Sequence, residues 1–148
     1  MNPSLKINLG YRDAPAAIRF LVEVLEFEQI VVYPGASQNM IAHAELHWPE
    51  GGIVTLHSAE QGKISVAELA AQADAGGGYP AFSVHIDTDN PERLFERVVN
   101  SGARIIRELT ASKLGRGFII ADPEGLYWSF GTPLPKLTRN EQGQWQPG

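Results

Sequence analysis

Alternation of apolar and polar residues marks the first strand that the chain predicts. Every second residue of the segment 5–11 is apolar, as in a strand with one buried face, and the segment 82–87 alternates in the same way. An amphipathic stretch follows each segment, opened by Asp-Ala-Pro at 13–15 and by Asp-Asn-Pro at 89–91. Asp and Asn side chains cap the free N–H groups of a helix, and proline in the first turn loses no helical hydrogen bond. Both stretches are therefore predicted to be helices.

The two predicted helices belong to an internal repeat with an offset of 76 residues. The matched pairs are Asp13 with Asp89, Pro15 with Pro91, Ile18 with Leu94, Val22 with Val98, and Ile30 with Ile106. Two unrelated helices that share start signals are the alternative. Five matches in one register favour a repeat over that alternative.

Three further strands are predicted after each helix, at 28–33, 40–48 and 53–57 and then at 104–109, 117–121 and 126–131. Glycines 51 and 52 form a turn in the first half, and Asp-Pro-Glu-Gly at 122–125 suits a type I turn in the second. Each half is thus βαβββ, which predicts an α+β fold. The predicted domain covers 4–132, with module one at 4–59, a linker with a short helix-like piece at 60–78, and module two at 79–132. Residues 133–148 are expected to form a loose tail.

Four short segments, in order along the chain, carry a resemblance to a known family. They are Tyr-Arg-Asp-Ala-Pro-Ala-Ala-Ile at 11–18, His-Ala-Glu-Leu at 43–46, Ser-Gly-Ala at 101–103, and Asp-Pro-Glu-Gly-Leu-Tyr-Trp-Ser-Phe-Gly-Thr at 122–132. Together they resemble the glyoxalase/bleomycin resistance/dioxygenase (vicinal oxygen chelate) superfamily, and especially its PhnB-like branch. The resemblance implies two βαβββ modules whose sheets curl into a cup with helices outside, usually in a homodimer. Such a fold does not by itself decide the function.

Alternation also sorts each strand into a helix side and a cup side, and all four histidines fall on the cup side. The candidate ligand-binding residues on that side are Lys6, Asn8, His43, Glu45, His47, Thr55, His57, Ser83, His85, Tyr127 and Ser129, with Asp87 beside them. These side chains either are ordinary exposed polar residues or supply hydrogen bonds and a proton acceptor in a pocket. Lys6 and Glu45 could instead form an ion pair without a role in binding.

Two further candidates lie outside the alternating pattern. Arg116 lies between Gly115 and Gly117 in a predicted loop, where it could hold an anionic ligand as part of a mobile lid or simply be solvated. Trp48 ends a predicted strand, where it could stack on a planar ligand or pack against a second subunit.

The resemblance also bears on metal binding. Metal-dependent members of the superfamily carry His, Glu or Gln at four positions, which fall on Lys6, Thr55, Ser83 and Ser129 in this chain. None is a good ligand for a divalent metal, and a lysine ammonium would repel one. We therefore expect no metal and no other cofactor. An alignment shifted by two residues would bring in His57 or His85.

Composition narrows the partners. The chain has 148 residues, of which 43% are hydrophobic and 20% charged, as expected for one globular domain. A net charge of −5 argues against nucleic acid, whose phosphates attract clustered basic residues. No apolar run is long enough to cross a bilayer and the N-terminus has no apolar signal core, so we expect a cytoplasmic protein without a membrane partner. The absence of cysteine excludes disulfides.

The leading hypothesis is a metal-independent small-molecule binding protein of the bleomycin-resistance type. It would hold a planar or hydrophobic compound in the polar cup of a homodimer. The alternative is a metal-dependent lyase, isomerase or dioxygenase that uses some of His43, Glu45, His57 and His85. A third hypothesis is a cup filled by its own side chains that only supports dimerisation or a partner contact. No catalytic residue is predicted.

Overall fold

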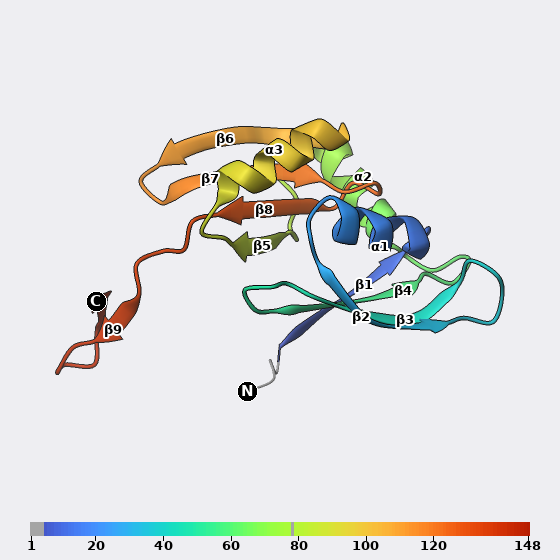
Figure 1. Cartoon of the computed structure of the whole chain (residues 1–148), viewed down its shortest axis with the longest axis horizontal. Helices are drawn as coiled ribbons and strands as arrows, with labels where there is room; N and C mark the ends of the chain where they lie inside the picture. The colour runs from blue at the N-terminus through green and yellow to red at the C-terminus, as the bar shows by residue number, and fades with distance from the viewer. Residues whose placement is uncertain (1–4, 78) are drawn as a thin grey trace.

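Two βαβββ modules follow each other along the chain, as the sequence predicts (Figure 1). The structure is a computed structural model that describes residues 5–77 and 79–148. The predicted start of the domain at residue 4 and the predicted end of the linker at residue 78 lie outside the described residues. No helix in the described ranges is long and apolar enough to cross a membrane.

Module one is a four-stranded sheet with one helix against it. Its elements are β1 (Lys6–Tyr11), α1 (Ala14–Glu23), β2 (Glu28–Pro34), β3 (Ile41–His47) and β4 (Ile53–Ser58). The strand order is β1-β4-β3-β2, with β1 parallel to β4 and the other pairs antiparallel. The parallel pair requires a crossover, which α1 and the β2–β3 hairpin provide.

Module two repeats this arrangement. Its elements are β5 (Val84–Asp87), α3 (Pro91–Ser101), β6 (Arg104–Ser112), β7 (Gly115–Ala121) and β8 (Tyr127–Gly131), with the strand order β5-β8-β7-β6. The linker contains α2 (Val66–Gly76), where the sequence predicts a short helix-like piece. Glu68 accepts hydrogen bonds from the backbone N–H and the hydroxyl of Ser65, a capping-box arrangement that explains why the helix begins there.

The repeat has an offset of 77 residues in its strand and helix, not the predicted 76. Asp13 caps α1 and Asn90 caps α3, each accepting from a backbone N–H three residues later at 3.1 Å. The buried pairs Ala17 with Leu94 and Leu21 with Val98 fit the same offset. Matching the two prolines misled the prediction, because a helix accepts proline at more than one position of its first turn.

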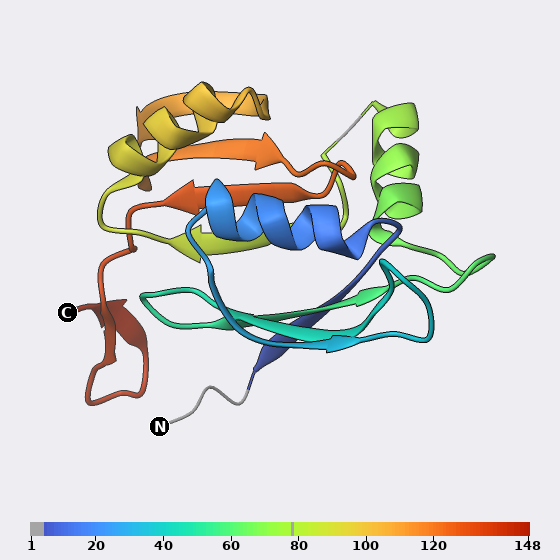
Figure 2. The same cartoon turned by 45° about the vertical axis from the view of Figure 1, so that its right-hand side comes forward.

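The helix-side faces of the two sheets share one hydrophobic core. The ring of Phe27 lies 5.7 Å from that of Trp128, and the ring of Trp48 lies 5.9 Å from that of Phe130. These pairs join residues of different modules, and α1 lies between the two sheets in both views of the chain (Figures 1 and 2). The opposite, polar faces of the sheets are therefore turned outward.

The turn after β7 ties the modules together. Asp122 is buried and accepts hydrogen bonds from Tyr11 Oη at 2.7 Å, Trp128 Nε1 at 3.0 Å and the backbone N–H groups of Glu124 and Leu126. Burial raises the pKa of Asp122 despite these donors. The Glu124 carboxylate accepts from the backbone N–H groups of Arg12 and Asp13, each at 2.8 Å.

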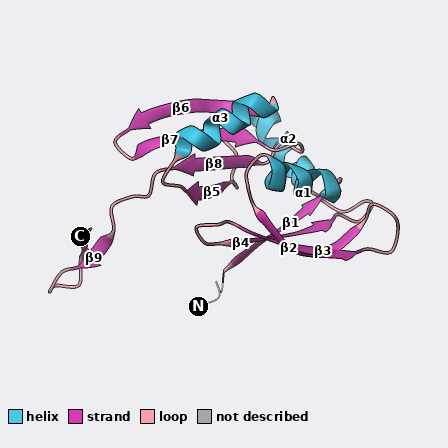
Figure 3. Ribbon diagram, in the orientation of Figure 1, coloured by secondary structure: helices cyan, strands magenta, loops and turns pink. Residues whose placement is uncertain are grey.

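The C-terminal segment contains a hairpin that the prediction of a loose tail lacked. Strands β9 (Leu137–Arg139) and β10 (Trp145–Pro147) pair in antiparallel register and project from the body of the molecule (Figure 3). The Asn140 side chain accepts from the N–H groups of Gln142 and Gln144, which fixes the turn. The short strands carry little alternation, so the turn was the only signal in the sequence.

Candidate functional site

Polar side chains gather on the outward face of module one. We call Lys6, Asn8, Glu45, His47, Thr55 and His57 the module-one face. The parallel register of β1 and β4 places Asn8 beside Thr55 and Gly10 beside His57. Thr55 Oγ1 donates to Asn8 Oδ1 at 3.0 Å, and His57 Nδ1 lies 3.3 Å from the same oxygen. A Cβ at Gly10 would lie 2.8 Å from His57 Nε2, so glycine leaves room for the imidazole.

A chain of three charged or titratable groups continues this face across β3. Lys6 Nζ lies 3.6 Å from Glu45 Oε1, and His47 Nε2 lies 3.1 Å from the same oxygen. The hydrogen bond from His47, with the charge of Lys6, lowers the pKa of Glu45. The ion pair between Lys6 and Glu45 that the sequence suggested is confirmed. Lys6 and His47 are thus already partnered, and the lowered pKa favours the charged form of the Glu45 carboxylate.

The fourth histidine lies apart from this network. His43 is exposed on β3, and its nearest aromatic neighbour is Tyr33, at 6.3 Å between ring centroids. The two residues are partners in the β2–β3 register. His43 therefore shares the polar side of the sheet but not the hydrogen bonds that order the rest of it.

A second polar set lies on the outward face of module two. We call Ser83, His85, Asp87, Tyr127 and Ser129 the module-two face. His85 is its centre, with Nδ1 3.0 Å from Ser129 Oγ and Nε2 3.3 Å from Asp87 Oδ1. Ser83 immediately precedes β5, and the Tyr127 ring lies 5.7 Å from that of Tyr79.

Arg107 is a candidate that sequence reasoning missed. It lines a hollow of about 270 Å³ beside the module-two face, together with His85 and Ser129. Arg107 lies in β6, at the opposite edge of the sheet from β5. Alternation along a single strand therefore gave no reason to associate it with His85. A guanidinium there can pair with an anionic or carbonyl group of a ligand.

A single chain does not bring the two faces together. A hollow of about 640 Å³ lies beside His57 in module one, and the hollow around His85 lies in module two. Neither hollow has lining residues from both faces. One described chain therefore does not form the cup that the sequence predicts for a homodimer. The parity that assigned the residues to each face agrees with the strand register, although Thr55 is buried.

Arg116 lies in a strand and Trp48 is buried, which differs from the loop and the accessible strand end that the sequence suggested. Arg116 is part of β7, not of a loop, and its guanidinium forms an ion pair with Glu92 at the start of α3. It lies two residues before the buried Phe118 in β7, so the two side chains share the helix side of the sheet. Trp48 is only 7% exposed and packs against Phe27 within the chain. Trp48 therefore packs mainly inside its own chain.

The residues at the four family metal positions do not fit a divalent metal. Lys6 and Ser83 each precede the cap of the following helix by seven residues, and Thr55 and Ser129 are equivalent in β4 and β8. An ammonium group and three hydroxyls offer no strong ligand. Within residues 5–77 and 79–148, no three His, Asp or Glu side chains are grouped so that they could hold a metal ion.

Comparison with known proteins settles the family. The model of the Glyoxalase/Bleomycin resistance protein/Dioxygenase superfamily matches residues 5–130. The chain belongs to this superfamily. Its relatives include an uncharacterized protein of Mycobacterium bovis and one of Mycobacterium tuberculosis, each 25% identical over 142 residues. These residues make up 95% of this chain and 90% and 81% of the two relatives.

Two solved structures have a similar fold. TioX from Micromonospora sp. ML1 is 28% identical with a TM-score of 0.68, over 90% of this chain and 100% of its own. TnmS3, an antibiotic binding protein from Streptomyces sp. CB03234, is 15% identical with a TM-score of 0.62, over 90% of this chain and 97% of its own. The superfamily assignment thus rests on the sequence match and is supported by two similar folds.

Proposed function

We propose that the protein binds a small molecule in a cup formed by two copies of the chain. The observation that carries this proposal is the outward orientation of two ordered polar faces that a single chain cannot bring together. In a homodimer, the module-one face of one protomer would lie against the module-two face of its partner. Each dimer would then contain two equivalent cups.

The two faces offer complementary chemistry for such a cup. The module-one face supplies His57 and Asn8, and the module-two face supplies His85 and Ser129 beside the Arg107 guanidinium. These groups donate and accept hydrogen bonds, which fixes the orientation of a ligand whose flat body occupies the space between the sheets. Antibiotic binding by the similarly folded TnmS3 supports the same class of ligand here.

We further propose that binding needs no metal and that the chain belongs to the PhnB-like branch. The residue types at Lys6, Thr55, Ser83 and Ser129 support the first point, and the segments 11–18, 43–46 and 122–132 support the second. A cytoplasmic location stays a prediction from the sequence. Elemental analysis of the purified protein tests the first point, because one equivalent of bound metal would contradict it.

Binding can be tested by thermal unfolding with anthraquinones, acridines and flavonoids. A ligand at about 100 times its Kd should stabilise the folded protein by about 2.7 kcal/mol. The variants H57W and H85W should each lose this stabilisation, because either indole would fill one side of the cup. The variant E108W, an exposed position on β6, should retain it. Binding that survives both H57W and H85W would contradict the proposal.

A further inference from the structure

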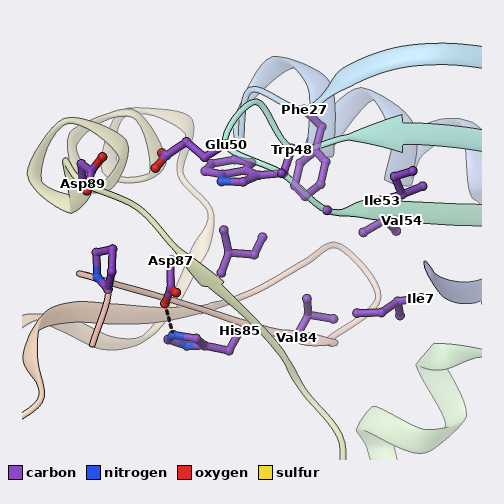
Figure 4. Close-up of a pocket in the computed structure, with 14 residues that line it drawn as sticks. Ile7, Phe27, Trp48, Glu50, Ile53, Val54, Val84, His85, Asp87 and Asp89 are labelled. Carbon is purple, nitrogen blue, oxygen red and sulfur yellow. Dashed lines mark hydrogen bonds and ion pairs between the residues drawn. The ribbon is translucent and has the colours of Figure 1, made fainter. Parts of the chain in front are cut away.

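A cleft of about 390 Å³ lies between the modules. It borders the module-two face at His85 and Asp87, but its other lining residues belong to neither polar face. Its apolar wall comes from the helix-side residues of both sheets, among them Ile86 and the labelled Ile7, Val54 and Val84 of Figure 4. Its volume lies in the range of small-molecule pockets. The proposed cup uses His85 but leaves the rest of this space without a role.

The indole of Trp48 gives the cleft a specific polar contact. Phe27 and Phe130 hold the ring, with centroids 5.2 and 5.9 Å from its own, so its orientation is fixed. Trp48 Nε1 is buried and has no hydrogen-bond partner in the part of the chain that the structure describes. The other core tryptophan, Trp128, donates to Asp122. Buried N–H groups are almost always paired, so an unpaired indole donor in the lining of the cleft indicates an external acceptor (Figure 4).

Carboxylates surround the mouth of the same cleft. Glu50 comes from the turn before β4, and Asp87 and Asp89 come from β5 and the segment that follows it (Figure 4). Asp87 Oδ1 lies 3.3 Å from His85 Nε2. Neither Glu50 nor Asp89 has an ion-pair partner among the residues that the structure describes. Two unpaired carboxylates above an apolar wall favour a cation over a neutral or anionic molecule.

We propose that this cleft is a second ligand site, which binds an organic amine. The ligand would carry an apolar ring against Ile86 and Val54, an oxygen that accepts from Trp48 Nε1, and an ammonium group beside Glu50 and Asp89. These three features lie within one cavity, so a single small molecule can satisfy them together. The site does not depend on dimerisation, because all of its residues come from one chain.

Three benzoyl amides test the charge requirement. Procainamide carries a ring, an amide carbonyl and a cationic amine, N-butylbenzamide lacks the charge, and hippurate carries a negative charge instead. Titration calorimetry should show that procainamide binds most tightly, N-butylbenzamide less tightly and hippurate least tightly. The double variant E50Q/D89N should raise the Kd of procainamide by about tenfold, because it removes two nearby charges. The Kd of N-butylbenzamide should change by less than about twofold. The control E96Q/E108Q changes the net charge by the same amount as E50Q/D89N, at exposed sites outside the cleft. It should leave the Kd of each of the three compounds unchanged.

The hydrogen bond of Trp48 can be observed directly by nitrogen-15 NMR. The variant W48F identifies the indole signal of Trp48 by its loss, and W145F serves as a control in the exposed tail. Procainamide should move the Trp48 Nε1–H signal downfield and leave that of Trp145 in place. An unchanged Trp48 signal at saturating procainamide, or equal binding of procainamide and hippurate, would overturn the proposal. So would an E50Q/D89N variant that binds procainamide like the wild type.

Discussion

Asp122 forms a buried side-chain hydrogen bond between the modules, through Tyr11. Its carboxylate accepts four hydrogen bonds, two from the side chains of Tyr11 and Trp128 and two from backbone N–H groups. The substitution Asp122→Asn would put an amide NH₂ where an acceptor is needed. We expect it to lower the free energy of unfolding by about 2–3 kcal/mol, measured by urea denaturation.

The matched control is Asp87→Asn, the same change at an exposed carboxylate. Its effect on the free energy of unfolding should stay within about 0.5 kcal/mol, because surface substitutions rarely exceed that. Equal effects of the two substitutions would show that Asp122 does not hold the modules together. The urea m-value should be the same for both variants if the folded states are equally compact.

The contacts of Glu68 stabilise the folded protein in a pH range that its pKa defines. Hydrogen bonds from Ser65 and Arg12 lower the pKa of Glu68 from 4.5 to about 2. The folded state therefore holds this proton less tightly than the unfolded state. The stabilisation from these contacts is fully present above pH 4.5 and is lost as the pH falls towards about 2.

The substitution Glu68→Gln tests this range. Its stability deficit relative to the wild type should be constant above pH 5 or so and should shrink towards pH 2, as followed by thermal unfolding across that range. The control Glu108→Gln changes an exposed residue of β6 and should give no such trend. A deficit that grows as the pH falls would contradict the account.

The sequence predicted single residues well where the strand period decided them. Asn8, Thr55, His57, His85 and Ser129 lie on the polar sides of their sheets, as alternation requires. Interactions between distant segments have no such period. The four contacts of Asp122 and the two of Glu124 were therefore invisible, although the sequence did predict the turn that holds both residues.

At the scale of elements, Asn90 caps α3 and its neighbour Asp89 does not. The substitution Asn90→Ala should lower the free energy of unfolding by about 1 kcal/mol, because the N–H of Arg93 loses its acceptor. Asp89→Ala should have an effect below about 0.5 kcal/mol, since Asp89 is exposed. Urea denaturation of both variants checks this. A larger loss of stability for Asp89→Ala than for Asn90→Ala would identify Asp89 as the cap and support the offset of 76.

Helices and strands of the two modules were predictable because each has a clear hydrophobic period or a start signal. The hairpin of β9 and β10 was not, because its strands have three residues each and are exposed throughout. Beside its backbone pairing, it is supported by the Asn140 turn and by the Arg139 guanidinium, which lies 4.8 Å from the Trp145 ring centroid. Short exposed hairpins of this kind have marginal stability in water.

At the scale of the whole molecule, a single chain does not close the cup that the sequence predicts for a homodimer, for a geometric reason. Alternation assigns a residue to one side of its own sheet but says nothing about the orientation of one sheet relative to another. The helix sides of both sheets meet in one core, so the polar faces turn outward and need a second copy to face each other. The two polar faces are thus predicted by the sequence, and the cup is a proposal about the dimer.

Cross-linking between two variants tests this central claim most directly, because the natural chain contains no cysteine. H57C carries a thiol on the module-one face and H85C on the module-two face. After the two variants are mixed and allowed to exchange subunits, a short bismaleimide should give a covalent dimer in the mixture and little in either variant alone. A mixture that cross-links no better than H57C or H85C alone would contradict a cup built from two chains.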